Sequence, residues 1–372
     1  MRTAKLDDIL KYEQPTKYIV DSEDYDNSYK TPVLTAGKTF VLGYTNEDKG
    51  IFDNLPVIIF DDFTTAFHYV DFPFKVKSSA MKLLKPVKDK ADLKYLFYKM
   101  QTISMDTDLH KRYWISKYSQ VEIPLPPLPQ QQKIANILDA ADLLRQKDKA
   151  LVVKYDELTK ALFLDMFGDP VSNPKGWKVK NLGQITNLVT DGKHGNCSDE
   201  PGSGYYFVSA KDIRNNKINY INSREIPKEE FEEVDKRTNL QPGDLVMINT
   251  GATIGRMAIA SNIPETRRST FQKSVAVIKV KEDIISSFFL QYVFELGLET
   301  FANMGSGSAI KNLLLSEMRR FNIILPNINL QKQFAERVQV IEQQKGIAQK
   351  SLEKSEELFN SLLQKAFKGE LV

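Results

Sequence analysis

The chain has 372 residues, of which 42% are hydrophobic and 27% are charged, and its formal net charge is +3 at pH 7. This length and composition are those of a globular protein with two or three domains. The apolar runs are too short to cross a bilayer, and acidic residues interrupt the N-terminal stretch where a signal peptide needs an apolar core. We therefore expect a cytoplasmic protein with no membrane partner.

Cysteine and histidine content argues against a metal site. Cys197 is the single cysteine, which leaves no internal disulfide and no cysteine-based zinc cage. The three histidines are far apart and show no ligand spacing. We expect neither a structural metal nor a bound cofactor.

Residues 1–128 have the pattern of an α+β domain. Short β-type runs such as TPVL, PVIIF and FPFKV are separated by Gly, Asn and Asp, and the helical stretch ADLKYLFYKM follows them. The AGKT stretch (36–39) invites comparison with a phosphate-binding loop, but that motif needs a glycine where this chain has Pro32. A strand followed by a polar loop is the better interpretation.

The stretch PLPPLPQQQKIANILD (124–139) has two interpretations: a proline-rich ligand for a partner domain, or the entry to a helix. Apolar residues at 3-4 spacing follow, and they predict a long coiled-coil helix over 129–167 that ends near Gly168. The expected seam residues are Ile134, Ile137, Ala141, Leu144, Leu151, Tyr155, Leu158 and Leu162, with Asp148 as a polar break.

After a linker (168–174), residues 175–328 again have an α+β pattern. The β-type runs YYFV, DLVMI and SVAVIKV precede the helical stretch ISSFFLQYVF, and YYFVSAKD (205–212) resembles TPVLTAGK (31–38). In GATIGR (251–256) the glycines allow two interpretations. They form a turn between two strands, or they bring the backbone close to a ligand, with Asn249, Thr250 and Arg256 exposed beside it.

The chain contains an internal repeat with an offset of 200 residues. Positions 111–167 and 311–367 share 12 identical residues in 57 aligned positions. The second copy keeps Pro326, Gln331 and Ala335 but loses the other prolines, which favours the helix-entry interpretation. Residues 329–369 are therefore predicted to form a second long helix, with its seam at Phe334, Val338, Ile341, Ala348, Leu352, Phe359, Leu362 and Ala366.

These segments predict the fold class. We expect two α+β domains separated by two long helices that form an antiparallel coiled coil, related by a pseudo-twofold repeat. Each helix would be about 55 Å long at ~1.5 Å per residue. The alternative is that both are core helices of a globular domain.

Recognisable catalytic motifs are missing from the sequence. There is no N-P-P-[FY] or D-P-P-Y tetrapeptide, no F-x-G-x-G, no G-x-S-x-G and no H-E-x-x-H. An enzyme would have to use a set of residues that sequence spacing does not reveal.

Basic and amide side chains gather in three stretches of the second domain: KHGN (193–196), KDIRNNK (211–217) and RRSTFQK (267–273). Arg reads guanine edges, Asn and Gln read adenine edges, and Lys and Ser hold phosphates. The alternative for each stretch is a solvated loop.

Four longer segments resemble the DNA-specificity subunits of type I restriction–modification systems. They are LFLDMFGDPVSNPKGWKVKNLGQI (162–185), LPPLPQQQKIANILD (125–139), LQPGDLVMINTGATIGRMAIA (240–260) with FQKSVAVIKV (271–280), and MGSGSAIKNLLLSEMRRFNIILPNINLQKQ (304–333). The resemblance covers essentially the whole chain, and the first domain matches least.

The resemblance implies a function. Each target recognition domain (1–128 and 175–328) reads one half of a bipartite, asymmetric site in double-stranded DNA, and the two spacer helices set the distance between the halves. Two modification subunits, which carry adenine methyltransferase chemistry and bind S-adenosylmethionine, dock on the helices, and ATP-dependent restriction subunits can join them. The chain itself would catalyse nothing.

Recognition loops diverge within this family, so we predict the residues that touch DNA from side-chain chemistry alone. The candidates in the first domain are Lys38, Thr39, Lys75, Lys77, Ser78, Arg112 and Lys117. Those in the second are Lys193, His194, Lys211, Arg214, Asn215, Arg256, Arg267, Gln272 and Lys273. Two rival functions remain: a non-catalytic coiled-coil scaffold with two protein-binding domains, and an enzyme with an unrecognised site.

Overall fold

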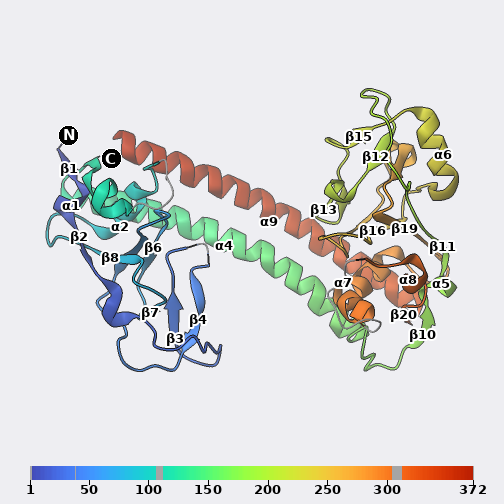
Figure 1. Cartoon of the computed structure of the whole chain (residues 1–372), viewed down its shortest axis with the longest axis horizontal. Helices are drawn as coiled ribbons and strands as arrows, with labels where there is room; N and C mark the ends of the chain where they lie inside the picture. The colour runs from blue at the N-terminus through green and yellow to red at the C-terminus, as the bar shows by residue number, and fades with distance from the viewer. Residues whose placement is uncertain (1, 38, 106–111, 304–311, 372) are drawn as a thin grey trace. The chain divides into compact units, whose positions relative to one another are not determined.

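The computed structural model describes residues 2–37, 39–105, 112–303 and 312–371 (Figure 1). The chain divides into two compact units. Unit 1 is Met1–Ala150 with Ala348–Val372, and unit 2 is Leu151–Ile347. Each unit thus contains one α+β region together with part of each of the two long helices, α4 (Leu128–Phe167) and α9 (Ile328–Lys368).

Unit 1 is built on two small sheets. A four-stranded sheet has the order β2-β8-β5-β6, a three-stranded sheet has the order β4-β3-β7, and β1 pairs with β9. The strands are β1 (Thr3–Lys5), β2 (Leu10–Glu13), β3 (Thr31–Leu34), β4 (Val41–Thr45), β5 (Val57–Asp61), β6 (Phe67–Val70), β7 (Lys75–Val76), β8 (Met81–Pro86) and β9 (Glu122–Pro124). The helices are α1 (Leu6–Ile9), α2 (Leu93–Met100) and α3 (Tyr113–Ser116), with 3-10 turns at Pro15–Tyr18 and Tyr118–Gln120.

Unit 2 repeats this plan. Its four-stranded sheet has the order β11-β19-β16-β17, its three-stranded sheet has the order β15-β12-β18, β10 pairs with β20, and a hairpin β13-β14 is added. The strands are β10 (Lys178–Asn181), β11 (Thr186–Asp191), β12 (Tyr206–Val208), β13 (Ile213–Arg214), β14 (Lys217–Ile218), β15 (Arg224–Glu225), β16 (Leu245–Ile248), β17 (Met257–Ile259), β18 (Ser269–Phe271), β19 (Val275–Val280) and β20 (Asn322–Leu325). The helices are α5 (Leu182–Ile185), α6 (Lys228–Thr238), α7 (Ser287–Asn303) and α8 (Leu315–Met318), with 3-10 turns at Ala210–Asp212 and Pro264–Arg268.

The repeat extends to single hydrogen bonds. In unit 1 the Asp62 carbonyl accepts from the Tyr113 amide at 2.8 Å, and in unit 2 the Asn249 carbonyl accepts from the Leu313 amide at 2.7 Å. The sequence resemblance of TPVL (31–34) to YYFV (205–208) makes Leu34 equivalent to Val208. The strand register agrees, because Leu34 pairs in parallel with Val76 and Val208 pairs in parallel with Phe271. The fold class predicted from the sequence is confirmed, whereas the exact domain boundaries stay predictions.

The glutamine shared by the two copies explains the helix entry. Gln131 accepts from the Asp92 amide and donates to the Pro126 carbonyl, both at 2.8 Å. Gln331 likewise accepts from the Ser286 amide and donates to the Pro326 carbonyl, both at 2.9 Å. Each side chain thus ties the start of a long helix to the segment that enters α2 or α7, which agrees with the helix-entry interpretation of the prolines.

The two long helices run antiparallel within each unit. In unit 1, Phe359 and Ala366 of α9 share an apolar core with Ile134 and Leu138 of α4, and Ser351 donates to Asp148 at 3.2 Å. In unit 2, Phe334 lies 5.5 Å from Phe163 between ring centroids, and Lys345 pairs with Asp156. Gly168 and Gly369 end the helices with left-handed φ values of 79° and 82°, as predicted.

The predicted seam is right for α9 and wrong at three of the eight residues predicted for α4. All eight predicted α9 residues are buried or partly buried. In α4 the residues Leu144, Leu151 and Leu158 are exposed, and Arg145, Val152 and Thr159 occupy the seam in their place. Each of these three leucines directly precedes the polar or β-branched residue that occupies the seam. Because leucine is the more apolar residue of each pair, the sequence pattern favoured the wrong heptad register.

Candidate nucleic-acid interface

Three segments of unit 2 lie side by side where β11, β12 and β18 end. The Lys193 amide donates to the Phe271 carbonyl at 2.7 Å, and the Lys273 amide donates back to the Lys193 carbonyl at 3.1 Å. The Gln272 amide donates to the Val208 carbonyl at 3.1 Å, which joins the segment after β12. We call Gly192–Lys193–His194, Ser209–Ala210–Lys211 and Gln272–Lys273 the unit 2 loop cluster. It brings together five of the residues predicted to touch DNA: Lys193, His194, Lys211, Gln272 and Lys273.

A groove of about 710 Å³ collects three more predicted residues. Arg214 and Asn215 of the β13–β14 hairpin line it together with Arg256, which directly precedes β17. Asn215 and Asn216 have left-handed φ values of 52° and 57°, as a tight two-residue hairpin turn requires. Glu295 and Glu299 of α7 line the same groove, so its charge is mixed.

The GATIGR stretch forms the turn between β16 and β17, as one of its two interpretations predicted. Gly251 and Gly255 have left-handed φ values of 101° and 88°. The second interpretation expected Asn249, Thr250 and Arg256 to be exposed beside a ligand, and it is wrong for Asn249, which is 4% exposed and donates to the Leu313 carbonyl at 3.3 Å. Thr250 is half-buried and donates to Asn312 at 2.8 Å, and only Arg256 of the three is exposed. Arg267 lies apart from both groups and donates to Asn262 at 3.4 Å.

Unit 1 has a corresponding loop cluster. The Lys77 amide donates to the Leu34 carbonyl at 3.1 Å, so Lys77 and Ser78 lie beside the loop that follows β3. Thr39 is exposed in that loop, and Lys38 lies outside the described residues. A side-chain hydrogen bond with Glu23 raises the pKa of Lys77. Arg112 and Lys117 are exposed at the two ends of α3.

The side chain of Lys75 is too buried to contact DNA. Its side chain is 3% exposed, pairs with Glu47 and donates to the Lys49 carbonyl at 2.8 Å. A buried, paired ammonium is held by its partners, because breaking the pair leaves an uncompensated buried charge. The structure therefore gives Lys75 a role inside the domain in place of the predicted DNA contact.

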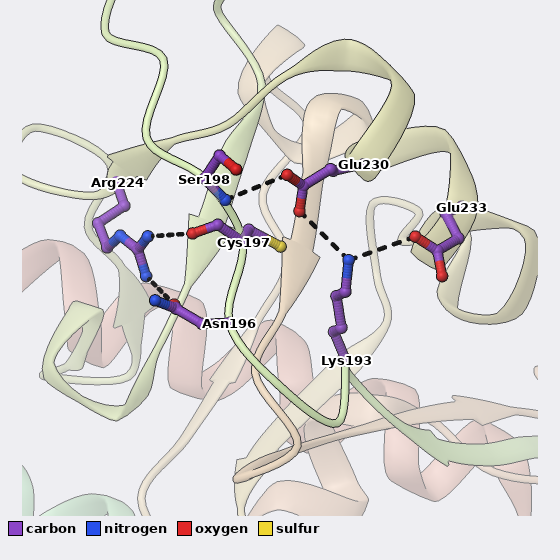
Figure 2. Close-up of polar contacts among 7 residues, drawn as sticks. All are labelled: Lys193, Asn196, Cys197, Ser198, Arg224, Glu230 and Glu233. Atoms are coloured by element: carbon purple, nitrogen blue, oxygen red, sulfur yellow. Dashed lines mark hydrogen bonds and ion pairs between the residues drawn. The ribbon is translucent and has the colours of Figure 1, made fainter.

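Lys193 is also engaged within the domain. Its ammonium lies 3.2 Å from Glu230 and 3.3 Å from Glu233, both on α6 (Figure 2). Arg224 of β15 donates to the Cys197 carbonyl and to Asn196 Oδ1, each at 2.6 Å. Hydrogen bonding from the Ser198 amide, with help from Cys197 and Lys193, lowers the pKa of Glu230 to about 2. Burial raises the pKa of the Cys197 thiol to about 11, so the thiol is protonated at neutral pH.

No local sequence pattern points to Arg224, Glu230 or Glu47, because each acts through partners that are distant along the chain. Gln131 and Gln331 did carry a signal, since they are identical in the two repeats.

Among the described residues, no group of three or more His, Cys, Asp or Glu side chains is arranged to hold a metal ion. None of the described helices is both long and apolar enough for a membrane span.

Gly192 is expected to be essential to the unit 2 loop cluster. A Cβ at this position would lie 1.8 Å from the Phe271 carbonyl oxygen, so Gly192→Ala must displace backbone. We expect a loss of about 1–3 kcal/mol in the free energy of unfolding, as for other overpacked sites. Urea unfolding would measure it. Gly346→Ala, whose Cβ would meet nothing within 4 Å, is the matched control and should stabilise the protein by about 0.5–1 kcal/mol. An unchanged midpoint for Gly192→Ala would contradict this close approach.

Comparison with known proteins identifies the family. A family model described as type I restriction modification DNA specificity domain matches residues 1–152 and 174–357. The specificity subunit of the Escherichia coli type I restriction enzyme EcoR124I/EcoR124II is 34% identical over 346 residues, which cover 89% of this chain and 84% of that protein. The Escherichia coli EcoBI specificity subunit is 26% identical over 284 residues, covering 67% of this chain and 58% of that protein.

A solved structure shares the fold. The S subunit of a type I restriction–modification system from M. genitalium superposes with a TM-score of 0.60 at 16% identity, over 98% of this chain and 96% of that one. A chain from a solved structure described as explaining complex assembly and conformational transition of a type I R-M system gives a TM-score of 0.56 at 16% identity, over 100% and 98% of the two chains. These two structures share the fold, and the family model together with the 34% identical relative shows that the chain belongs to the family of type I restriction–modification DNA specificity subunits.

Proposed function

We propose that each α+β domain of this chain reads one half of a bipartite, asymmetric DNA target. The observation that carries the proposal is that the two domains repeat the same arrangement of strands and loops, which we call the repeated frame, but carry different side chains at equivalent loop positions. Lys77 and Ser78 follow β7 in unit 1, and Gln272 and Lys273 occupy the equivalent positions after β18 in unit 2. One frame with unlike hydrogen-bonding groups suits two half-sites of unlike sequence, since base edges are distinguished by donors and acceptors.

The long helices support a spacer role. They contain 40 and 41 residues, about 60 Å each at ~1.5 Å per residue, and each passes from one compact unit into the other. One turn of DNA rises about 34 Å, so helices of this length are of the right order to separate two contacts. The spacer between the half-sites would then depend on helix length and not on the loop clusters.

Modification subunits are the partners that we propose for the helices. Several large apolar side chains on α4 and α9 are exposed, which favours a protein partner. They are Leu143, Leu144, Leu151, Val153, Leu158 and Leu164 on α4, and Val340, Ile347 and Leu358 on α9. The partners would bind S-adenosylmethionine and methylate adenine, restriction subunits can join, and this chain would supply specificity without catalysis.

Methylation mapping tests the proposal. Cells that express this chain together with its cognate modification subunit should acquire adenine methylation at one split, non-palindromic motif. Sequencing that detects methylated bases would reveal the motif and its spacer. The same cells without this chain are the control. An unchanged methylation pattern in cells where the complex demonstrably assembles would refute the proposal and favour a scaffold.

The spacer role has its own test. Four residues are inserted into α4 after Lys149 and four into α9 after Lys350, at positions near the Asp148–Ser351 contact, so that both helices grow together. The inserted turn adds about 6 Å at ~1.5 Å per residue. The spacer should lengthen by about one to two base pairs at ~3.4 Å each, with both half-sites unchanged. Altered half-sites would contradict this division of labour.

A further inference from the structure

In each domain, one further segment lies beside the edge strand of the three-stranded sheet and forms a backbone hydrogen bond with it. In unit 1 the Val20 amide donates to the Val76 carbonyl at 3.0 Å, and in unit 2 the Lys193 amide donates to the Phe271 carbonyl at 2.7 Å. These bonds place the two segments at equivalent positions beside β7 and β18. We call residues 19–22 and 192–199 the edge segments. The edge segment of unit 2 begins in the unit 2 loop cluster.

A glutamate holds the edge segment of unit 1. One oxygen of Glu47 accepts from the backbone amides of Asp21 and Ser22, at 2.9 and 3.1 Å. The other oxygen accepts from the buried ammonium of Lys75. Glu47 lies in the loop after β4, so a single carboxylate ties the edge segment to two other parts of the sheet.

A glutamate also holds the edge segment of unit 2. One oxygen of Glu230 accepts from the Ser198 amide at 3.1 Å, and the other lies 3.2 Å from the Lys193 ammonium (Figure 2). Glu230 belongs to α6, an eleven-residue helix that precedes β16. The two carboxylates therefore come from different elements, and each accepts at least one backbone amide from the edge segment of its own domain.

Electrostatics indicates what these carboxylates do. A carboxylate beside a DNA-reading surface repels phosphates, so it is costly there unless it is neutralised. Both glutamates are paired with a lysine and accept backbone amides, so each orders its edge segment while its charge is partly or fully offset. Ordering a binding loop before the ligand arrives reduces the conformational entropy lost on binding.

We propose that Glu47 and Glu230 are positioning residues for target specificity, each holding the edge segment of its own domain in the conformation that reads its half-site. This inference rests on the proposed function, in which the two domains read separate half-sites. It extends that function to two residues that need not touch DNA. Glu230 and Glu47 act through the edge segments, and their substitution should change which bases are preferred.

Glu230→Ala and Glu47→Ala, each in complex with the modification subunits, test the inference. A library of double-stranded DNA with random bases is methylated by each complex, and the methylated molecules are sequenced to give a base preference for every position. Glu230→Ala should reduce discrimination at one half-site by about tenfold and leave the other half-site nearly unchanged. Glu47→Ala should do the same at the opposite half-site.

Three controls separate positioning from stability. Glu233→Ala removes only a second, more exposed partner of Lys193 and should leave both half-sites unchanged. Glu230→Gln and Glu47→Gln keep an acceptor for the backbone amides and should retain most of the discrimination. Glu47→Gln also leaves the buried Lys75 ammonium without a counter-charge, so it should lower stability without changing which bases are preferred. Thermal unfolding of each complex shows whether the fold is intact, since a purely structural loss lowers methylation of all targets alike.

The outcomes distinguish the two proposals. A wild-type complex that selects no bipartite target refutes the proposed function itself. A wild-type complex that selects one, with both alanine variants selecting it unchanged, refutes the role of Glu47 and Glu230. A uniform loss at both half-sites in either alanine variant, or in both glutamine variants, also overturns the inference, because a positioning residue acts on its own half-site.

Discussion

Gln331→Leu is expected to lower the free energy of unfolding by about 2–4 kcal/mol, because it leaves buried backbone groups without hydrogen-bond partners. Gln331 is fully buried and serves three of them: the Ser286 amide at 2.9 Å, the Pro326 carbonyl at 2.9 Å and the Ile284 carbonyl at 3.3 Å. Leucine has a similar volume, so packing changes little and the polar loss dominates. Urea unfolding followed by circular dichroism would measure the change.

The repeat supplies a second version of the same experiment. Gln131→Leu removes the equivalent clamp in unit 1, which serves the Asp92 amide and the Pro126 carbonyl. Hydrogen exchange should locate the loss of protection in unit 1 for Gln131→Leu and in unit 2 for Gln331→Leu. Gln333→Leu, at an exposed position of α9, is the matched control and should have little effect. Equal stabilities for Gln331→Leu and Gln333→Leu would show that the clamp contributes nothing.

The parts of the fold that could be predicted from the sequence are those encoded by repetition and periodicity. The offset of 200 residues identified both long helices, and the identical residues Gln131 and Gln331 mark the contacts that fix their starts. The predicted α4 seam was wrong at three of its eight residues, because Leu144, Leu151 and Leu158 outweighed Arg145 and Thr159 in the pattern. Packing against the partner helix determines which polar residues lie in the seam. The periodicity of one helix contains no information about its partner.

The candidate interface could be predicted only as a set of segments. KHGN and FQK were chosen by chemistry, and the structure brings them together through backbone bonds between Lys193, Phe271 and Lys273. Composition could not tell a free lysine from a paired one. Lys75 and Lys193 resembled DNA ligands in sequence, but their carboxylate partners, Glu47 and Glu230, lie 28 and 37 residues away along the chain. Ion pairs of this kind depend on tertiary folding, which a local pattern does not contain.

A buried ion pair gives the second prediction with a large effect. Asp62 and Lys82 in unit 1 are each 3% exposed, with 3.5 Å between their charged atoms, and Asp62 also accepts from the Trp114 amide at 2.8 Å. Asp62→Asn keeps an acceptor for that amide but leaves the Lys82 ammonium buried without a counter-charge. We expect a loss of about 3–5 kcal/mol in the free energy of unfolding, measured by urea unfolding.

The second repeat suggests how the loss can be reversed. Strand register makes Asn249 equivalent to Asp62 and Ala276 equivalent to Lys82, so unit 2 has neither charge. Replacing both residues, Asp62→Asn with Lys82→Ala, should therefore cost less than the sum of the two single changes by about 1–3 kcal/mol. Strictly additive effects would contradict a direct interaction between the two charges. A favourable interaction free energy between Asp62 and Lys82 would show that the charged pair of unit 1 and the neutral pair of unit 2 can each occupy the same position of the repeated fold.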